Sequence, residues 1–396
     1  MRILLVNDYY PPRKVGGAEI AVAALAGALV QAGHAVTVLT GSDGQSQHGE
    51  QVISTGLEAH WGSPTDPKRG VARRAQRLLN ASPVGAAALE RVAKDLTPDI
   101  VHTHNIRLFG LGAWAWFRKQ GWPTVHTAHD YFLVCPFRGM FKAGQPCATP
   151  CTECAAYHWR RGSRLAALNG LITASRHVML THEAAIPALA HLPARAVIPN
   201  GIEPPTARIP LERPSAGALT VGYLGRLVRR KGAHAVVEAA RLLGDAPVRF
   251  LIAGRGEAAD EAALKAQAPG NVSFLGHVRR DDFFRQLDLL VMPAEWHEPF
   301  GLVVGEAQLA GLPVIVSRRG ALPEMIRPGE TGAVLADGPI ARCLADVLAP
   351  LAQDPAPVLA WRQALAAAPL AVADWPQIAG QTVAFYRSVA SARSRL

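Results

Sequence analysis

The sequence predicts an α/β fold of two doubly wound, Rossmann-like parallel-sheet domains, and three observations lead to this prediction. The chain has 396 residues, which is enough for two domains with separate hydrophobic cores. Short apolar segments alternate with helical stretches in both halves, a pattern typical of parallel sheets. A proline-rich segment, Glu203–Pro214, separates the halves and indicates a linker. We therefore expect domains at residues 1–203 and 204–374.

Composition restricts the class of protein. Charged residues make up 18% of the chain and hydrophobic residues 49%, which indicates a globular protein. Because there is neither an apolar run long enough to span a membrane nor a signal peptide, we expect a cytoplasmic protein. The net charge of +10 fits phosphorylated substrates, an anionic membrane surface or nucleic acid. No zinc finger, helix-turn-helix or RNA-binding motif supports nucleic acid as a partner.

The first half begins with an apolar strand at residues 2–7. A loop ending in Gly16 and Gly17 follows, and then a helix from about Ala18 to Ala32. Backbone amides at such a helix start can bind a phosphate, although a Gly–Gly pair is more often only a flexible turn. Further strands are expected at His34–Thr40, Asp99–Asn105, Thr124–Asp130, Gly170–Ser175 and Ala196–Ile202.

The alternation of strands and helices becomes less regular between Ser42 and Thr97. Within this region, residues 67–79 (PKRGVARRAQRLL) combine basic and apolar side chains. A helix of this kind can bind an anionic membrane surface, which would suit a lipid-linked substrate. The alternative is an ordinary solvated surface helix or loop.

The second half repeats the alternation of strands and helices. Its strands are expected at Leu219–Gly225, Val248–Gly254, Val272–Val278, Asp288–Ala294, Pro313–Ser317 and Gly332–Ala336. The last stretch, Trp375–Ala392, has the pattern of an amphipathic helix. The second half therefore also predicts a doubly wound sheet.

The segment EPFGLVVGE, from Glu298 to Glu306, follows the strand at Asp288–Ala294 and opens a helix near Gly301. The amides of Gly301, Leu302 and Val303 would attract an anion such as a phosphate. Glu298 lies before these amides and Glu306 in the second turn, so together they can bracket a ligand with hydroxyls at both ends. A nucleotide sugar is such a ligand. The alternative is that two glutamates only solvate the ends of a buried helix.

Two cations follow the first strand of the second half. The segment GYLGRLVRRKG supplies Arg226 and, five residues later, Lys231. Cations fixed at this point would stabilise a diphosphate that gains negative charge as it leaves. An Arg and a Lys on a surface turn are otherwise simply solvated.

The motifs E-P-F-G-L-x-x-x-E and G-R-L-x-x-x-K-G resemble those of the retaining glycosyltransferases of family 4, which have the GT-B fold. The resemblance implies two domains that face each other across a cleft, with the terminal helix packing back on the first domain. It implies that Glu298 binds sugar hydroxyls, Glu306 the ribose hydroxyls, and Arg226 and Lys231 the diphosphate. No catalytic metal is then required.

The resemblance extends to other residues. Arg255 would contact the base or a phosphate, and the backbone at His277 and Val278 would read the base edge. His129, at the end of a strand, would approach the donor sugar, with its carbonyl facing the reacting carbon. Asn200 and Gly201 resemble the family's interdomain turn.

Three of the histidines before His129 lie in the neighbouring strand segments Asp99–Asn105 and Thr124–Asp130. We expect His126 to lie inside its strand, while His102 and His104 either reach the acceptor or only pack. In the mechanism that the resemblance implies, the leaving phosphate takes the acceptor proton in a front-face displacement. Retention would otherwise call for a carboxylate nucleophile.

Four of the five cysteines lie close together in the sequence, and Cys343 is expected in a buried helix. The spacing of the four clustered cysteines, C-x11-C-x3-C-x2-C, is compatible with a structural zinc site, because four thiolates can complete a tetrahedron. The alternatives are reduced thiols or a disulfide. These residues are Cys135, Cys147, Cys151 and Cys154.

The sequence therefore predicts a retaining hexosyltransferase that uses a UDP- or GDP-sugar. Its expected acceptor is a glycan or lipid-linked molecule of bacterial polysaccharide or glycoconjugate synthesis. The expected location is the cytoplasm, with peripheral contact to the inner face of the plasma membrane. Two alternatives are a non-catalytic nucleotide-sugar-binding scaffold or sensor and a non-hydrolysing epimerase of the same fold.

Overall fold

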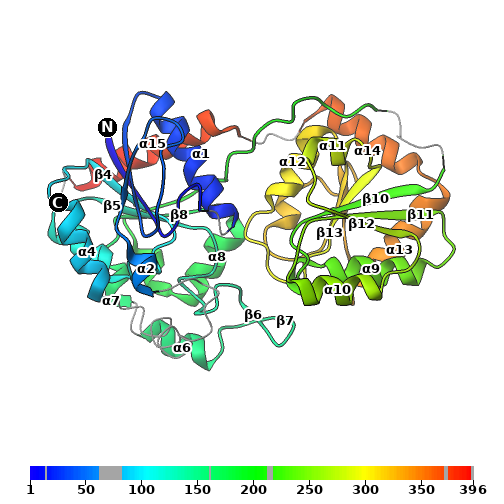
Figure 1. Ribbon diagram of the computed structural model, residues 1–396, viewed down its shortest axis with the longest axis horizontal. Coiled ribbons are helices and arrows are strands. Elements are labelled where there is room, and N and C mark those ends of the chain that lie inside the picture. Colours follow the sequence, from blue (N-terminus) through cyan, green and yellow to red (C-terminus); the bar gives the residue numbers. More distant parts are fainter. Residues whose placement is uncertain (14–15, 62–82, 160–161, 212–216, 370–372, 394–396) are drawn as a thin grey trace. The chain divides into compact units, whose positions relative to one another are not determined.

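The structure is a computed structural model that describes residues 1–13, 16–61, 83–159, 162–211, 217–369 and 373–393 (Figure 1). The chain forms two compact units. The first unit comprises Met1–Met140, Ala148–Gly201 and Ala373–Leu396, and the second comprises Phe141–Cys147 and Ile202–Val372. The basic segment at residues 67–79 lies outside the described residues.

A seven-stranded parallel sheet forms the centre of the first unit. Its strand order is β3-β2-β1-β4-β5-β8-β9. The strands are β1 (Arg2–Asn7), β2 (Ala35–Thr40), β3 (Gln51–Ser54), β4 (Ile100–Thr103), β5 (Thr124–Ala128), β8 (Gly170–Thr173) and β9 (Ala194–Val197). The predicted parallel sheet is confirmed. Strand β3 was not anticipated, because it has only four residues, two of them apolar, at the sheet edge.

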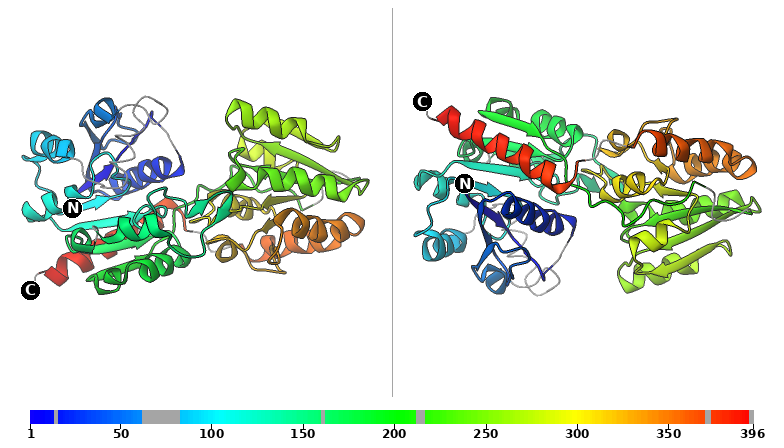
Figure 2. Two further views of the ribbon diagram at one scale, coloured as in Figure 1. Left: turned by 90° about the horizontal axis from the view of Figure 1, so that it is seen from below. Right: turned by 90° about the horizontal axis from the view of Figure 1, so that it is seen from above.

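The helices of the first unit connect these strands. They are α1 (Gly17–Gln31), α2 (Leu57–Trp61), α4 (Pro83–Ala93), α5 (Gly112–Lys119), α6 (Thr152–Trp159), α7 (Gly162–Leu165), α8 (Arg176–Ala185), η2 (Pro187–His191) and α15 (Trp375–Arg393). Helix α15, drawn in red in Figure 2, packs against α1 and the sheet. Its Ile378 and Tyr386 share a buried cluster with Leu5 and Val22, so the end of the chain helps to form the first core.

A second parallel sheet has the order β12-β11-β10-β13-β14-β15. Its strands are β10 (Leu219–Leu224), β11 (Val248–Ala253), β12 (Val272–Gly276), β13 (Leu289–Met292), β14 (Val314–Val316) and β15 (Gly332–Val334). The chain order reverses between β10 and β13. Ligands of open α/β sheets bind at such a switch point, beyond the carboxyl ends of the strands.

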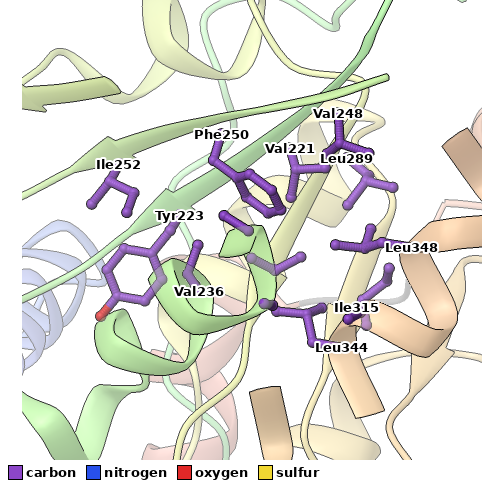
Figure 3. Close-up of a cluster of buried hydrophobic side chains, with 14 of the residues drawn as sticks. Val221, Tyr223, Val236, Val248, Phe250, Ile252, Leu289, Ile315, Leu344 and Leu348 are labelled. Carbon is purple, nitrogen blue, oxygen red and sulfur yellow. The ribbon is translucent and has the colours of Figure 1, made fainter. Parts of the chain in front are cut away.

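The helical segments of the second unit are η3 (Arg229–Lys231), α9 (Ala233–Leu243), α10 (Ala258–Ala266), α11 (Arg280–Phe284), α12 (Leu302–Ala310), η4 (Leu322–Met325), α13 (Ile340–Gln353) and α14 (Ala356–Ala367). Helices α9 and α13 bury their apolar faces on one side of the sheet. Figure 3 shows Leu344 and Leu348 of α13 pointing toward Leu289 and Ile315 of the strands. This core gives the loops at the strand ends a rigid support.

A small antiparallel hairpin, β6 (Phe141–Lys142) and β7 (Gln145–Pro146), clusters with the second unit although it lies early in the sequence. Strands of two residues carry no periodicity, so the sequence did not reveal them. Among the helices that the structure describes, none is both long and apolar enough to cross a membrane.

Candidate functional site

The loops after β10 and β13 hold the site of the second unit. The two strands are parallel neighbours, with Val221 paired to Leu289, so their carboxyl ends meet at one edge of the sheet. The loop after β10 carries Arg226 and Lys231, and the loop after β13 carries Glu298. The fold therefore brings together residues that are about seventy positions apart in the sequence.

Lys231 and Glu298 form an ion pair at this edge, with 2.6 Å between Nζ and Oε2. The indole Nε1 of Trp296 donates a second hydrogen bond of 2.9 Å to the same Oε2. The Lys231 ammonium also lies 4.9 Å from the centroid of the Trp296 ring. Glu298 is only 7% exposed, so its charge is stabilised mainly by these two partners.

Close backbone packing fixes the position of Glu298. The Ala321 amide donates to the Glu298 carbonyl over 2.8 Å. Gly320 has φ of +65°, and a Cβ on it would lie 2.3 Å from the Glu298 oxygen. Only glycine allows this approach, so the Glu298 loop depends on Gly320.

The turn that carries Lys231 is fixed in a similar way. Gly232 has φ of +85°, and a Cβ there would lie 1.9 Å from the carbonyl oxygen of Pro293. The Tyr223 hydroxyl donates to the carbonyls of Arg226, at 2.9 Å, and Lys231, at 3.3 Å. Burial, followed by the charge of Glu298, raises the pKa of Tyr223, so it remains a donor. The sequence analysis missed Tyr223, which lies within an apolar strand.

Helix α12 begins directly after Gly301, whose φ is +94°, as the sequence predicted. The amides of Leu302 and Val303 lie in its first turn, where no helical carbonyl precedes them. Glu306, in the second turn, pairs with Arg280, with 3.0 Å between Oε1 and Nη1. Burial raises the pKa of Glu306, and Arg280 opposes this effect.

Arg280 was not identified from the sequence. It also contacts Asp281 at 2.9 Å, and Asp281 accepts hydrogen bonds from both the amide and the hydroxyl of Thr206. These hydrogen bonds lower the pKa of Asp281. A pair of adjacent arginines and aspartates after β12 was the only sequence signal for this network.

Arg255 follows β11 and is 67% exposed in its side chain, with a 3.2 Å ion pair to Glu261. Its guanidinium lies near Gly276, where a Cβ would be 3.1 Å from Nη2. Because Gly276 ends β12, Arg255 and the segment of His277 and Val278 lie at adjacent strand ends. The predicted base-contacting residues therefore belong to one edge of the second sheet.

In the first unit, buried histidines line the ends of β4 and β5. His104 Nδ1 lies 2.9 Å from His129 Nε2, and His104 is 2% exposed. His102 lies 2.6 Å from both the Tyr386 hydroxyl and Thr127 Oγ1. Burial lowers the pKa of His102 to about 3 and that of His129 to about 4. His102 and His129 are therefore neutral even in mildly acidic solution.

His126 lies inside β5, as predicted, and its Nδ1 is 3.0 Å from the Thr103 hydroxyl. A cavity of about 20 Å³, enough for one water molecule, lies beside His102, His104 and His129. Asn200 also lines it, and a Cβ on Gly201 would lie 2.5 Å from the Trp375 ring. The Asn200–Gly201 turn thus packs against α15.

The sequence analysis also missed Asp8, which directly follows β1. Its carboxylate accepts hydrogen bonds from the amides of Arg107, at 3.0 Å, and Leu108, at 2.8 Å. Burial raises the pKa of Asp8 to about 6, although Arg107 opposes this. Asp8 therefore ties the loop after β1 to the loop after β4.

Gly16 and Gly17 lie at the start of α1, as expected. The Gly16 amide, however, donates to Oε2 of Glu19 over 2.7 Å, and Glu19 is buried. The helix start is thus already capped by a carboxylate of the chain itself. A phosphate would have to displace Glu19 from this amide.

The cysteines do not form the predicted four-thiolate group. Cys151 Sγ lies 3.8 Å from Cys154 Sγ at the start of α6. Burial and the proximity of Cys135 raise the pKa of Cys154 to about 12. Across the described residues, no three His, Cys, Asp or Glu side chains are arranged as metal ligands, so the geometry does not support the zinc hypothesis. Cys147 lies in the stretch that clusters with the second unit, whereas the other three belong to the first.

A larger cavity, of about 510 Å³, is found at the opposite edge of the first sheet. Its lining includes Trp122, Asn169 and Pro193, which precede β5, β8 and β9. We do not assign the site to it, because ligands of parallel sheets bind at the carboxyl ends of the strands.

Comparison with known proteins identifies the family. Residues 15–205 match the model described as Glycosyltransferase Family 4, and residues 218–354 match Glycosyl transferases group 1. A D-inositol 3-phosphate glycosyltransferase from Arthrobacter sp. (strain FB24) is 30% identical over 368 residues, covering 86% of this chain and 83% of that protein.

An uncharacterized 42.6 kDa protein in the cps region of Klebsiella pneumoniae is 29% identical over 337 residues, covering 83% of this chain and 88% of the relative. The crystal structure of Anabaena HepE in complex with UDP and glucose has a TM-score of 0.68 at 20% identity, covering 98% of this chain and 99% of HepE. Its similarity shows a common fold. The chain belongs to the glycosyltransferases of family 4, within the glycosyl transferases group 1, and has the GT-B fold.

Proposed function

We propose that this glycosyltransferase moves a sugar from a nucleotide diphosphate sugar to a glycan or lipid-linked acceptor, with retention at the anomeric carbon. The observation that carries the proposal is the Lys231–Glu298 pair, held by Trp296 at the switch point of the second sheet. An anion-binding and a hydroxyl-binding group are thus adjacent, as a diphosphate joined to a sugar requires. HepE, whose crystal structure is a complex with UDP and glucose, shares this fold.

The groups of the second unit act on successive parts of the donor. Glu298 accepts hydrogen bonds from sugar hydroxyls. Lys231 and the exposed Arg226 neutralise the diphosphate, together with the first amides of α12. Since the leaving diphosphate gains charge as the bond breaks, these cations favour the transition state over the ground state.

The nucleoside occupies the remaining groups. Glu306 accepts hydrogen bonds from the ribose hydroxyls, with Arg280 limiting its rotation. Arg255 contacts the base or the neighbouring phosphate, and the backbone at His277 and Val278 reads the base edge. Comparing the binding affinities for UDP and GDP would show which base these residues accept.

In the reaction, the bond from the anomeric carbon to the phosphate oxygen breaks, and the acceptor oxygen bonds to the same face. The acceptor proton passes to the leaving phosphate oxygen. His129 of the first unit approaches the donor sugar and, being neutral at pH 7, adds no positive charge. No protein nucleophile is needed in this scheme, in contrast to the double displacement of retaining glycosidases.

The proposed acceptor follows from the names of two relatives and from the charge of the chain. The Arthrobacter relative is named for transfer involving D-inositol 3-phosphate, and the Klebsiella relative is named for a cps region. A glycan or lipid-linked acceptor of polysaccharide or glycoconjugate synthesis fits the basic character of the chain, whose net charge is +10. The protein would then act in the cytoplasm, in peripheral contact with the anionic inner face of the membrane.

The first test is a thermal-shift panel of nucleoside diphosphates and nucleotide sugars on the wild type and on Glu306→Ala. Ligands that bind only the folded state raise its melting temperature. Glu330→Ala is the matched control, because Glu330 also forms a 3.0 Å ion pair with an arginine of the second unit. We expect a shift with one base that disappears in Glu306→Ala and persists in Glu330→Ala.

A wild type that no nucleotide stabilises would contradict the proposal. With the base known, the anomeric configuration of the transferred sugar is measured by the proton coupling of its C1 hydrogen. A product of inverted configuration would refute retention while leaving the transfer itself intact.

A further inference from the structure

Trp296 contacts three charged residues in the loops that hold the second unit's site, Glu298, Lys231 and Arg230. Its indole N–H donates a hydrogen bond of 2.9 Å to Glu298. Both Lys231 Nζ and Arg230 Cζ lie 4.9 Å from the centroid of its ring. Its backbone amide donates to the Arg230 carbonyl over 3.2 Å, which joins the loop after β13 to the turn after β10. Trp296 is 7% exposed, so these contacts are shielded from water.

The two hydrogen bonds to Glu298 share one oxygen. Lys231 and Trp296 both donate to Oε2, and for the part of the chain that the structure describes no hydrogen bond or ion pair to Oε1 is found. A carboxylate held in this way has one oxygen anchored and one available as an acceptor. The arrangement therefore orients Glu298 before any ligand arrives.

An indole suits this position because its ring and its edge have opposite polarity. The negative face attracts cations, and the polarised N–H at the edge donates to an anion. A phenylalanine would keep the face and lose the donor, whereas a leucine would lose both. The residue thus matches a site in which a cation and a carboxylate must be held side by side.

We infer that Trp296 is the positioning residue of the donor site: it holds Glu298 so that Oε1 accepts from the donor sugar, and it holds Lys231 for the diphosphate. The inference rests on the proposed function of Glu298 and Lys231. Trp296 itself neither transfers a proton nor touches the reacting bond.

Two substitutions separate the two tasks. In Trp296→Phe the hydrogen bond to Glu298 is lost, so we expect kcat to fall about 10- to 100-fold, the cost of losing a hydrogen bond to a charged group. Affinity for the nucleoside diphosphate should stay within about threefold of wild type, since the aromatic face remains. In Trp296→Leu, diphosphate affinity should fall as well.

Trp361→Phe is the matched control. Trp361 is also a buried tryptophan of the second unit, and its Nε1 donates to a backbone carbonyl, that of Gly329, over 3.0 Å. This variant loses the same donor without touching Glu298. Its kcat should stay close to that of wild type, even if its melting temperature falls as much as that of Trp296→Phe.

A spectroscopic measurement adds a readout that needs no activity. With 15N-labelled tryptophan, the indole N–H resonance of Trp296, assigned by its loss in Trp296→Phe, should shift when Glu298 is changed to Gln. The Trp361 resonance should not move. This shift would establish the contact in solution whether or not the substrate is known.

The outcomes separate the two proposals. Equal kcat in wild type and Trp296→Phe, or an indole resonance unmoved by Glu298→Gln, would overturn the role of Trp296 while transfer by the wild type still stands. If the wild type binds no nucleotide and transfers no sugar, the proposed function fails instead.

Discussion

The two units place their polar residues at equivalent sites, the carboxyl ends of parallel strands, and yet treat charge in opposite ways. In the second unit, the partly exposed Lys231 forms an ion pair of 2.6 Å with the buried Glu298. In the first unit, burial lowers the pKa of His102 to about 3 and that of His129 to about 4, so both stay neutral even at pH 5. Pairing and neutralisation are two ways to bury an ionisable group. The site of the second unit uses pairing, whereas these histidines of the first unit use neutralisation beside a paired group, the Asp130–Arg138 ion pair at 2.7 Å.

The contrast fits the tasks that we propose for the units. A diphosphate needs fixed positive charge, which the second unit provides in Arg226 and Lys231. His129, which we propose to approach the donor sugar, offers an imidazole that can form a hydrogen bond without adding charge. The electrostatic difference can be tested by changing the charge on each side.

The largest effect is expected from removing the charged pair. Glu298→Ala or Lys231→Ala should lower transfer by at least about 1000-fold, because each removes a group that acts on the donor in the transition state. Glu295→Ala is the control, since Glu295 lies on the same loop and pairs with the exposed Arg229. Initial rates measure the effect, and circular dichroism verifies the fold. Activity within a few-fold of wild type in either variant would refute the site assignment.

The next effect concerns the loop that carries Glu298. Gly320→Ala should cost about 3 kcal/mol of unfolding free energy or more, because its Cβ would overlap the Glu298 backbone at 2.3 Å. Gly329→Ala is matched to it: φ is +81° and nothing lies within 4 Å of the added Cβ. That variant should cost only about 1 kcal/mol. Denaturant midpoints measure both, and equal losses would show that the close approach is unimportant.

Acid should weaken the first unit more than the second. His129 titrates at about 4 in the folded protein against 6.5 unperturbed, and His102 at about 3, so the unfolded chain binds more protons in between. Stability therefore falls as the pH drops below about 6.5 and levels off near 3. Asp8 partly offsets this loss, because its pKa of about 6 lies above the usual 3.8. His104 and His126, whose pKa values burial also lowers, add to the loss, so the free energy of unfolding should decrease by several kcal/mol between pH 7 and pH 4.

Hydrogen exchange read by mass spectrometry can follow peptides of both units, once corrected for intrinsic rates. Protection in β4 and β5 should decrease between pH 7 and pH 5 more than protection in β10 and β13. His129→Gln should flatten this response, whereas His191→Gln, at an exposed position of the first unit, should not. A uniform loss of protection in both units would contradict the electrostatic contrast.

The smallest effect comes from the terminal helix. Tyr386→Phe removes the 2.6 Å contact with His102 Nδ1 and should cost about 1 kcal/mol. Tyr157→Phe removes a comparable 2.7 Å hydrogen bond to the Phe132 carbonyl. Thermal unfolding should show similar losses, but only Tyr386→Phe should change the acid response. An unchanged acid response in that variant would mean that Tyr386 does not act on His102.

Much of the architecture was predictable, because buried parallel strands are continuous apolar runs. Every strand predicted in the second half is present, and α12 begins at Leu302, next to the predicted start near Gly301. Strand β3 and the hairpin of β6 and β7 were missed because segments of two to four residues carry no measurable periodicity.

The site was predictable only in part. Glu298, Glu306, Arg226 and Lys231 lie in motifs with a recognisable spacing. Their partners do not, since the sequence cannot show which side chain meets them in space. The cysteine spacing illustrates the opposite error. Four thiols in twenty residues suggested a metal site, but although Cys151 lies 3.8 Å from Cys154, the described cysteines are not arranged as metal ligands.

What the sequence by itself determined is the alternation of strands and helices, the two-domain organisation of the fold and the identity of the charged residues at the strand ends. These features are local, because they follow from hydrophobic periodicity and from the chemistry of single segments. Only the tertiary structure decided that Trp296 joins Lys231 to Glu298, that Arg280 holds Glu306 and that four histidines lose their charge. The reason is physical. Ion pairing and desolvation depend on which groups come into contact when distant segments pack, and a local sequence pattern does not determine those contacts.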